Sequence, residues 1–259
     1  MKKAISPIIT WCVKEQKNNL KRSGRILALL LAILLFSGAA FAVYAGDFYR
    51  ADDYALEALE SSEDITVTAY DKFIAFSPPD PVKGLIFYPG GKVEFTSYAP
   101  LMRECAREGI MCVLLKMPLN LAFFDVNAAS GIPGEFPYIK EWYICGHSLG
   151  GVAASMYIQK HYEEFEGIIF LASYPAADLS KTDLKALSIY GSEDGVLNMK
   201  SYIKNSADLP RDTSEFVIDG GCHAYFGSYG PQRGDGEAKI TKYKQTAVTA
   251  EKIIEFTGG

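Results

Sequence analysis

Histidine is scarce in this chain of 259 residues, which contains only His147, His161 and His223. These residues do not cluster with one another or with cysteines at the spacing of zinc ligands. We therefore expect no metal site and no bound cofactor. Any histidine that acts as a base must be one of these three, which shortens the search for a catalytic site.

The five cysteines are Cys12, Cys105, Cys112, Cys145 and Cys222. Their number is odd and their spacing is not that of a zinc site, so they do not define a disulfide framework. Cys145 lies in an apolar run and is expected to be a small buried side chain. Cys105 and Cys112 can pair only if the fold brings them together, and the sequence leaves that open.

Positive charge is sparse over most of the chain. Residues 1–25 carry seven Lys and Arg and one Glu, whereas residues 26–259 carry nineteen Lys and Arg against thirty Asp and Glu. The larger part therefore has a formal net charge of −11 and no basic stripe, which argues against binding to nucleic acid. The ordinary composition, 49% hydrophobic and 22% charged, predicts a folded protein.

One long apolar segment lies near the N-terminus. Residues 26–45 are all uncharged, enough for a helix of about 30 Å, the thickness of the hydrocarbon core of a bilayer. We expect residues 26–46 to anchor the chain in the cell membrane as a single-pass helix. Residues 1–25 would then be a basic cytoplasmic segment and the remainder extracytoplasmic. A cleaved signal peptide and a buried core helix are the alternatives.

Residues 47–64 are expected to form a stalk, with a helix at 49–62, between the anchor and a folded domain at 65–259. In that domain, runs typical of strands alternate with helical patterns. We expect strands at 65–70, 73–76, 84–88, 110–115, 142–146, 167–171, 186–190 and 215–218. We expect helices at 95–108, 149–161, 198–207 and 241–256.

This alternation predicts an α/β fold with a mostly parallel central sheet flanked by helices on both faces. The strands at 65–70 and 73–76 are expected to form a hairpin ahead of the parallel part. The segment 172–185, between the strands at 167–171 and 186–190, is short and leaves little room for an inserted domain. We therefore expect little or no cap domain.

Residues 142–151 read W-Y-I-C-G-H-S-L-G-G. A buried strand, a sharp turn and a helix of small residues form the context that a G-x-S-x-G nucleophile elbow requires. The turn is expected to hold Ser148 in a strained conformation at the carboxyl end of the sheet. A side chain at Gly146 or Gly150 would collide with the neighbouring helix or strand. An ordinary Gly-Ser turn is the alternative.

A serine hydroxyl is a weak nucleophile and needs a base within hydrogen-bond reach. His147 is expected to point away from the tip of Ser148, and His161 to lie on the surface. His223 follows the last strand and reaches the same edge of the sheet as the elbow. It is therefore the expected base.

The base in turn needs a carboxylate that fixes its tautomer. Asp194 follows the strand at 186–190 and is the expected acid. Glu193, its neighbour, and Asp178, after the strand before, are the alternatives for this role. A helix cap or turn residue is the structural interpretation of Asp194.

Acyl transfer also needs hydrogen-bond donors aimed at the developing oxyanion. The backbone N–H of Leu149, directly after the serine, is one expected donor. The second is expected from Gly91 or Lys92, in the P-G-G-K loop that follows the strand at 84–88.

The order of Ser148, Asp194 and His223 resembles that of the α/β-hydrolase superfamily over residues 65–258. The segment G-G-C-H-A-Y-F-G-S-Y-G at 220–230, with G-D-G at 234–236, is similar to a compact, membrane-anchored bacterial branch related to dienelactone hydrolases and small carboxylesterases. The resemblance implies an α/β-hydrolase fold with these residues as nucleophile, acid and base. The P-G-G-K loop departs from the His-Gly-Gly loop of many lipases, and Cys222 stands where a polar residue is expected.

Taken together, these residues predict a serine hydrolase that cleaves a small-molecule or surface-borne carboxylic ester, with the bilayer as partner of residues 26–46. Four aromatic residues are expected near the site: Tyr88, Tyr174, Tyr225 and Phe226. A thioesterase, lipase or acyltransferase with the same three residues is one alternative. A non-catalytic binding module on the same fold is the other.

Overall fold

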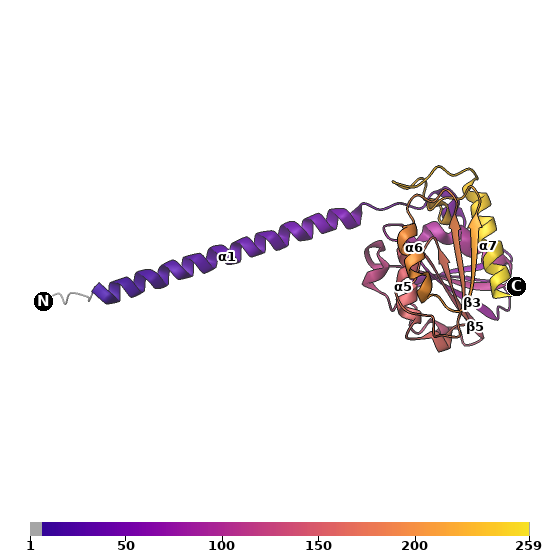
Figure 1. Cartoon of the computed structure of the whole chain (residues 1–259), viewed down its shortest axis with the longest axis horizontal. Helices are drawn as coiled ribbons and strands as arrows, with labels where there is room; N and C mark the ends of the chain where they lie inside the picture. The colour runs from indigo at the N-terminus through magenta and orange to yellow at the C-terminus, as the bar shows by residue number, and fades with distance from the viewer. Residues whose placement is uncertain (1–6, 259) are drawn as a thin grey trace. The chain divides into compact units, whose positions relative to one another are not determined.

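The computed structural model describes residues 7–258, which fall into two units that meet between Asp47 and Phe48. The first unit consists of helix α1 (Pro7–Gly46) (Figure 1). Its part Arg22–Gly46 is long and apolar enough to cross a membrane, in agreement with the span expected at 26–46. Residues 1–6 of the expected basic segment and the side chain of Cys12 lie outside the described residues.

The second unit is built around an eight-stranded sheet with the order β1-β2-β4-β3-β5-β6-β7-β8. Strands β1 and β2 pair antiparallel, β2 pairs antiparallel with β4, and all other pairs are parallel. The expected hairpin and the mostly parallel sheet are therefore confirmed. The strands are β1 (Thr66–Ala69), β2 (Phe73–Ser77), β3 (Lys83–Tyr88), β4 (Ile110–Leu115), β5 (Glu141–His147), β6 (Gly167–Leu171), β7 (Lys185–Gly191) and β8 (Asp212–Ile218).

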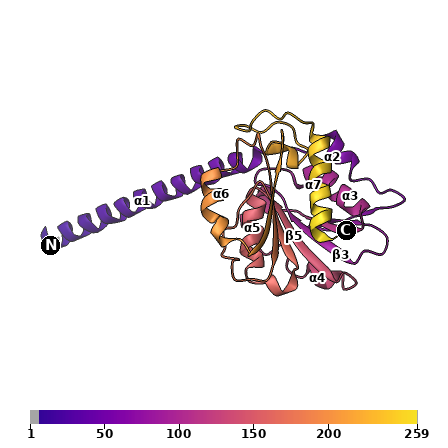
Figure 2. The same ribbon diagram turned by 45° about the vertical axis from the view of Figure 1, so that its right-hand side comes forward.

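Helices cover both faces of this sheet (Figure 2). Helices α3 (Ala99–Arg107) and α7 (Lys242–Thr257) lie on one side, over a core that includes Leu85 and Phe87 of β3. Helices α5 (Leu149–Ile158) and α6 (Met199–Asn205) lie on the other, where the core includes Ile86 and Tyr88. Successive residues of β3 are buried on opposite faces, which explains why its sequence is an unbroken apolar run.

The other helical segments are short and lie in the connections. They are α2 (Asp53–Glu57), α4 (Ile132–Glu135) and the 3₁₀ turns η1 (Phe95–Tyr98), η2 (Pro118–Asn120), η3 (Ala122–Phe124), η4 (Tyr162–Glu164), η5 (Ser206–Asp208) and η6 (Ala224–Phe226). Residues 172–184, between β6 and β7, are all described, and none of them lies in a helix or strand. This segment is too short to build a cap, as expected.

The expected stalk helix at 49–62 is wrong in length and surroundings. Tyr49 forms a parallel bridge with Val93, and its N–H donates to the Lys92 carbonyl at 2.8 Å. Asp52 then caps the five-residue helix α2 by accepting from the Ala55 N–H at 3.1 Å. The segment that follows α1 therefore belongs to the second unit and packs on its loops.

The four described thiols are free and buried. Burial raises the pKa of Cys145 well above its ordinary value, which confirms that it is a core side chain. Burial also raises the pKa of Cys112, and a hydrogen bond with the Cys105 thiol adds to the rise. The fold thus brings Cys105 and Cys112 together as two free, buried thiols and not as a disulfide.

Candidate active site

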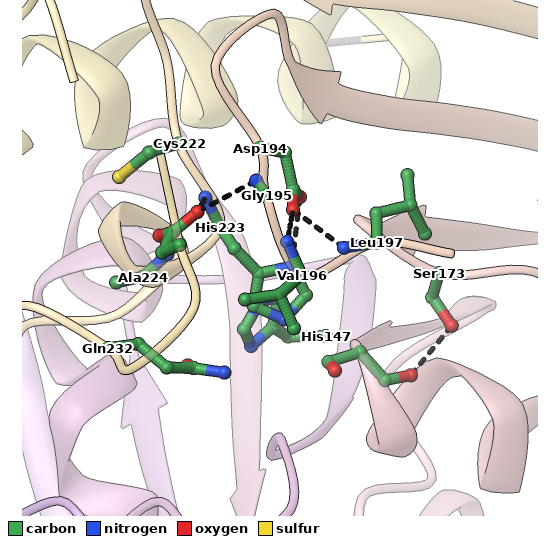
Figure 3. Close-up of polar contacts among 12 residues, drawn as sticks. His147, Ser173, Asp194, Gly195, Val196, Leu197, Cys222, His223, Ala224 and Gln232 are labelled. Atoms are coloured by element: carbon green, nitrogen blue, oxygen red, sulfur yellow. Dashed lines mark hydrogen bonds and ion pairs between the residues drawn. The ribbon is translucent and has the colours of Figure 1, made fainter. Parts of the chain in front are cut away.

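The turn between β5 and α5 holds Ser148 in a strained backbone conformation, with φ of 51° and ψ of −121°. Two hydrogen bonds hold it there. The Ser148 N–H donates to the Leu171 carbonyl at 2.9 Å, and the Ser173 hydroxyl donates to the Ser148 carbonyl at 2.7 Å (Figure 3). A non-glycine residue at positive φ is uncommon, so the observed geometry agrees with the expected elbow.

The expected collisions at the two glycines of the elbow are confirmed. A Cβ atom at Gly146 would lie 2.4 Å from the nitrogen of Gly151, and one at Gly150 would lie 2.1 Å from the carbonyl oxygen of Tyr88. Strand β5, helix α5 and the end of β3 therefore meet backbone to backbone around Ser148. Only glycine permits that approach.

Asp194 and His223 form a buried pair at the carboxyl end of the sheet. The His223 Nδ1 lies 2.8 Å from the Asp194 Oδ2, and each side chain is 2% exposed (Figure 3). The other oxygen of Asp194 accepts from the backbone N–H groups of Val196 at 2.8 Å and Leu197 at 2.7 Å. The two backbone N–H groups fix the orientation of the Asp194 carboxylate, so that its other oxygen faces Nδ1 of the imidazole.

The two alternative acids have other partners. Glu193 accepts from the Lys239 ammonium at 2.6 Å, and Asp178 accepts from the hydroxyl and the N–H of Ser180. His161 lies at the surface with its Nδ1 2.8 Å from a carboxylate oxygen of Glu164. Among the candidates taken from the sequence, Asp194 and His223 are the ones that the fold joins.

A cavity of about 170 Å³ lies beside His223 and the elbow. Ser148 and His223 both contribute to its wall, together with Leu149, Val152, Ala172, Ser173, Tyr174, Val196, Leu197 and Asn198. The Nε2 of His223 is buried and has no hydrogen-bond partner among the described residues. Ser148 and His223 therefore face one cavity without a hydrogen bond between the Ser148 hydroxyl and Nε2.

The expected oxyanion donors differ in availability. The Lys92 N–H donates to the Asn120 carbonyl at 2.8 Å, and the Gly90 N–H donates to the Tyr98 hydroxyl at 3.0 Å. The Gly91 N–H makes no hydrogen bond within residues 7–258, and a Cβ at Gly91 would lie 2.7 Å from the Leu149 side chain. The Gly91 N–H therefore remains the predicted second oxyanion donor, whereas the Lys92 N–H already has an acceptor.

Leu149 is the first residue of α5, so its N–H has no acceptor within the helix. The helix N-terminus also favours negative charge at this position. Leu149 and Gly91 lie against each other, and Leu149 lines the cavity. The N–H groups of Leu149 and Gly91 both lack an acceptor within residues 7–258.

His147 has a neighbour that the sequence did not suggest. Its ring lies 4.5 Å from that of His223, centroid to centroid, and its Nδ1 lies 2.8 Å from the Tyr98 hydroxyl. Burial lowers the pKa of His147 well below its ordinary value, and the nearby His223 adds to this effect. The sequence feature that could have indicated this contact between His147 and His223 is the position of His147 at the end of a buried strand, next to the elbow.

Of the four aromatic residues expected to line the site, Tyr174 does so. Tyr88 instead points into the core, where its hydroxyl donates to the Val126 carbonyl at 2.8 Å. Phe226 packs against the His147 ring at 5.5 Å, and Tyr225 lines a separate cavity behind the His223 loop. Tyr88, Tyr225 and Phe226 therefore do not line the cavity that Ser148 and His223 share.

The thiol of Cys222 is free and buried. Burial raises the pKa of Cys222 to about 12, and the carboxylate of Asp235 adds to the rise. Within residues 7–258, no three His, Cys, Asp or Glu side chains are grouped so that they could hold a metal ion.

The fold has known counterparts. The sequence profile of the Alpha/beta hydrolase family matches residues 84–247, and the chain therefore belongs to that family. It is a hydrolase by family, with the eight-stranded α/β-hydrolase sheet described above. No curated protein matches the chain.

Solved structures with the same fold are distant in sequence. Est1E from Butyrivibrio proteoclasticus is 13% identical, with a TM-score of 0.55 over 76% of this chain and 100% of its own. The naproxen esterase (carboxylesterase NP) from Bacillus subtilis is 12% identical, with a TM-score of 0.55 over 79% of this chain and 95% of its own. The esterase domain of a Rhodothermus marinus protein is 13% identical, with a TM-score of 0.56 over 74% of this chain and 97% of its own.

Proposed function

We propose that the protein is a serine hydrolase that cleaves carboxylic esters through an acyl-enzyme formed on Ser148. The observation that carries the proposal is the buried contact between Asp194 and His223, which leaves Nε2 of His223 without a partner at the cavity that Ser148 also lines. A base with one nitrogen fixed and the other available beside a strained serine is the arrangement that acyl transfer requires.

In the first half-reaction, the Nε2 of His223 takes the proton of the Ser148 hydroxyl as the oxygen attacks the ester carbonyl carbon. The carbonyl oxygen becomes an oxyanion, which accepts from the N–H groups of Leu149 and Gly91. The intermediate then expels the alcohol oxygen, which takes the proton from Nε2. Throughout, Asp194 accepts from the Nδ1–H and stabilises the imidazolium.

In the second half-reaction, water replaces the alcohol. Its proton passes to the Nε2 of His223 while its oxygen attacks the acyl carbon, and the oxyanion again accepts from the same two N–H groups. When the intermediate collapses, the carboxylic acid leaves and the Ser148 oxygen recovers the proton. The cycle consumes one ester and one water, and it yields one alcohol and one acid.

The size and lining of the cavity favour a small acyl group. A volume of about 170 Å³ walled by Leu149, Val152, Ala172, Val196 and Leu197 suits a short apolar chain. Without a cap, the alcohol side of the ester is open to solvent and can be large or borne on a surface. Similar folds that include esterases support an ester over an amide.

We place the reaction outside the cytoplasm, with α1 retained as a single-pass anchor in the cell membrane. The support is the apolar length of Arg22–Gly46 and the excess of Lys and Arg in residues 1–25. The N-terminal residue of the mature protein decides between this anchor and a cleaved leader. A mature chain that begins near residue 43 or 46 would contradict the anchor.

The proposed nucleophile is tested by labelling with a fluorophosphonate probe and by hydrolysis of p-nitrophenyl acetate and decanoate. We expect wild type to be labelled, Ser148→Ala to lose labelling and at least about 10³-fold in kcat, and acetate to be the better substrate. The control is Ser206→Ala, because Ser206 is exposed and its hydroxyl donates to the carbonyl of Ile203, three residues before it.

A folded wild-type protein that neither takes the label nor hydrolyses either ester would favour a non-catalytic binding module. Labelling that persists in Ser148→Ala would move the nucleophile elsewhere. A preference for decanoate would leave the nucleophile in place but contradict the small acyl site.

A further inference from the structure

Asp235 lies in the loop between β8 and α7 and accepts hydrogen bonds from four backbone N–H groups. Three of them, from Gly195 at 3.1 Å, His223 at 3.1 Å and Gly236 at 2.9 Å, reach Oδ1. The fourth, from Ala224 at 2.8 Å, reaches Oδ2. A single carboxylate therefore receives donors from three separate stretches of chain.

Two of these stretches carry the proposed acid and base. Gly195 directly follows Asp194 in the loop after β7, and the other stretch contains His223 itself and Ala224 in the loop after β8. The Asp194–His223 contact joins the same two loops through side chains. Asp235 joins them a second time, through hydrogen bonds from their backbone N–H groups.

The loop that carries Asp235 fits closely against the acid loop. A Cβ at Gly195 would lie 2.6 Å from the Gly234 carbonyl oxygen, and a Cβ at Gly236 would lie 1.9 Å from the Glu193 carbonyl oxygen. Burial alone would raise the pKa of Asp235, but the amides of Ala224, Gly195, His223 and Gly236 together lower it. The side chain therefore stays a charged acceptor with every donor in place.

The other side of the base loop is held differently. Gln245 of α7 accepts from the Cys222 N–H at 3.0 Å and donates to the Cys222 carbonyl at 2.7 Å. Gln245 has no contact with the acid loop among the described residues. The Ser192 hydroxyl also joins the two loops by accepting from the Gly220 N–H at 2.8 Å, and the Glu193 N–H donates to the Gly221 carbonyl at 2.8 Å. Asp235 differs from these contacts because it binds the backbone of His223 itself and that of Gly195, next to Asp194.

We propose that Asp235 is a positioning residue of the active site, whose carboxylate holds the backbones of the Asp194 loop and the His223 loop at the spacing that their own hydrogen bond needs. The inference rests on the proposed function, because it assigns a purpose to the geometry of the acid and base. Asp235 touches neither the cavity nor Ser148, so it acts through the pair and not on substrate.

The test is Asp235→Asn in the full chain, with p-nitrophenyl acetate and the fluorophosphonate probe. The asparagine keeps one acceptor oxygen, but its NH₂ group faces a backbone N–H, so at least one loop is released. We expect kcat and the labelling rate to fall about 10- to 100-fold with KM changed less than about twofold, as for a small misplacement of catalytic groups. The matched control is Asp212→Asn, because Asp212 is exposed at the start of β8.

A double-mutant cycle separates positioning from simple loss of stability. In Asp194→Asn, the amide oxygen stays with the Val196 and Leu197 N–H groups and the NH₂ group faces Nδ1. The acceptor of the Nδ1–H is then lost, so Asp235 has no productive pair left to hold. We expect kcat of the double variant Asp194→Asn/Asp235→Asn to lie within about threefold of Asp194→Asn alone. Losses that multiply, or wild-type kcat in a folded Asp235→Asn, would overturn the proposal.

Two further measurements keep the outcome clear. Thermal unfolding is recorded for each variant, and the milder Asp235→Ser, which retains a short acceptor, replaces Asp235→Asn if the latter does not fold. If wild type is active and labelled at Ser148 while Asp235 variants match it, the positioning role fails alone. If wild type is inactive, the proposed function itself fails.

Discussion

At the scale of single residues, the geometry assigns a protonation state to His147. The Tyr98 hydroxyl accepts from the Gly90 N–H, and its own hydrogen needs an acceptor because the side chain is fully buried. The Nδ1 of His147 is the atom in reach, at 2.8 Å. His147 is therefore neutral, with its proton on Nε2, and it packs an uncharged ring against the base.

The buried, neutral His147 makes stability depend on pH. Its folded pKa lies well below the ordinary value of 6.5 that the unfolded chain has. As the pH falls below about 6.5, the unfolded chain binds a proton that the native protein does not, so the free energy of unfolding decreases. The slope contributed by one such group is at most about 1.4 kcal/mol per pH unit.

Urea unfolding at pH 7.5 and 5.5 measures this slope in wild type and in His147→Gln. We expect the variant to lose part of the decrease, whereas His161→Gln, at the surface beside Glu164, keeps it. An equal decrease in wild type and His147→Gln would show that the buried imidazole is not the source.

At the scale of elements, the backbone of α5 packs directly against the end of β3. Gly150→Ala would place a Cβ 2.1 Å from the Tyr88 carbonyl oxygen, a backbone atom that cannot move aside. We expect a loss of several kcal/mol in the free energy of unfolding, or no folding at all. The control is Gly134→Ala in α4, because a Cβ there meets nothing within 4 Å.

Chemical denaturation of the two alanine variants measures the difference. A Gly150→Ala protein as stable as wild type would mean that α5 can move away from β3 at little cost. The same variant also reports on the site, because a displaced α5 moves the Leu149 N–H away from the proposed oxyanion position.

The elements that could be predicted from sequence are those whose signals are local. Long apolar runs predicted β3 to β7, and the G-x-S-x-G motif predicted the elbow, because both patterns depend on neighbouring residues alone. The stalk helix failed because Tyr49 pairs with Val93, a partner distant in sequence. Lys92 failed as a donor for the same reason, since its N–H is taken by Asn120.

The direction of individual side chains was the other feature that could not be predicted from the sequence. Tyr88 and Phe87 are adjacent, and which of them faces which side of the sheet depends on the pairing of β3 with β4 and β5. The sequence favoured Asp194 over Glu193 as the acid only by its position after the strand. In the structure, the turn directs the carboxylate of Asp194 toward His223 and that of Glu193 toward Lys239.

At the scale of the whole molecule, the second unit begins earlier than the expected domain boundary at residue 65. Asp52 donates through its N–H to the Ser228 carbonyl at 3.0 Å, and its Oδ1 accepts from the Ser228 hydroxyl at 2.8 Å. Tyr49 accepts through its hydroxyl from the Arg233 N–H at 3.0 Å. Residues 48–64 therefore bind loops on both sides of the site.

Two truncated proteins test this boundary. We expect the fragment 48–259 to keep kcat/KM for p-nitrophenyl acetate within about twofold of the full chain, and the fragment 65–259 to lose at least about tenfold or to fail to fold, because loops that position catalytic groups lose their supports. Thermal unfolding of both fragments is the accompanying measurement. Equal activity and stability of the two would return the boundary to residue 65.

Lys83 begins β3, and its ammonium binds the carbonyl oxygens of Thr257 and Gly258 at 2.6 Å each. The last helix thus finishes at the amino end of the parallel strands, whereas Ser148 and His223 lie at their carboxyl end. A resin, tag or fused reporter coupled after the last residue would therefore be attached at the edge of the sheet opposite Ser148 and His223. The opening of the cavity would stay unobstructed.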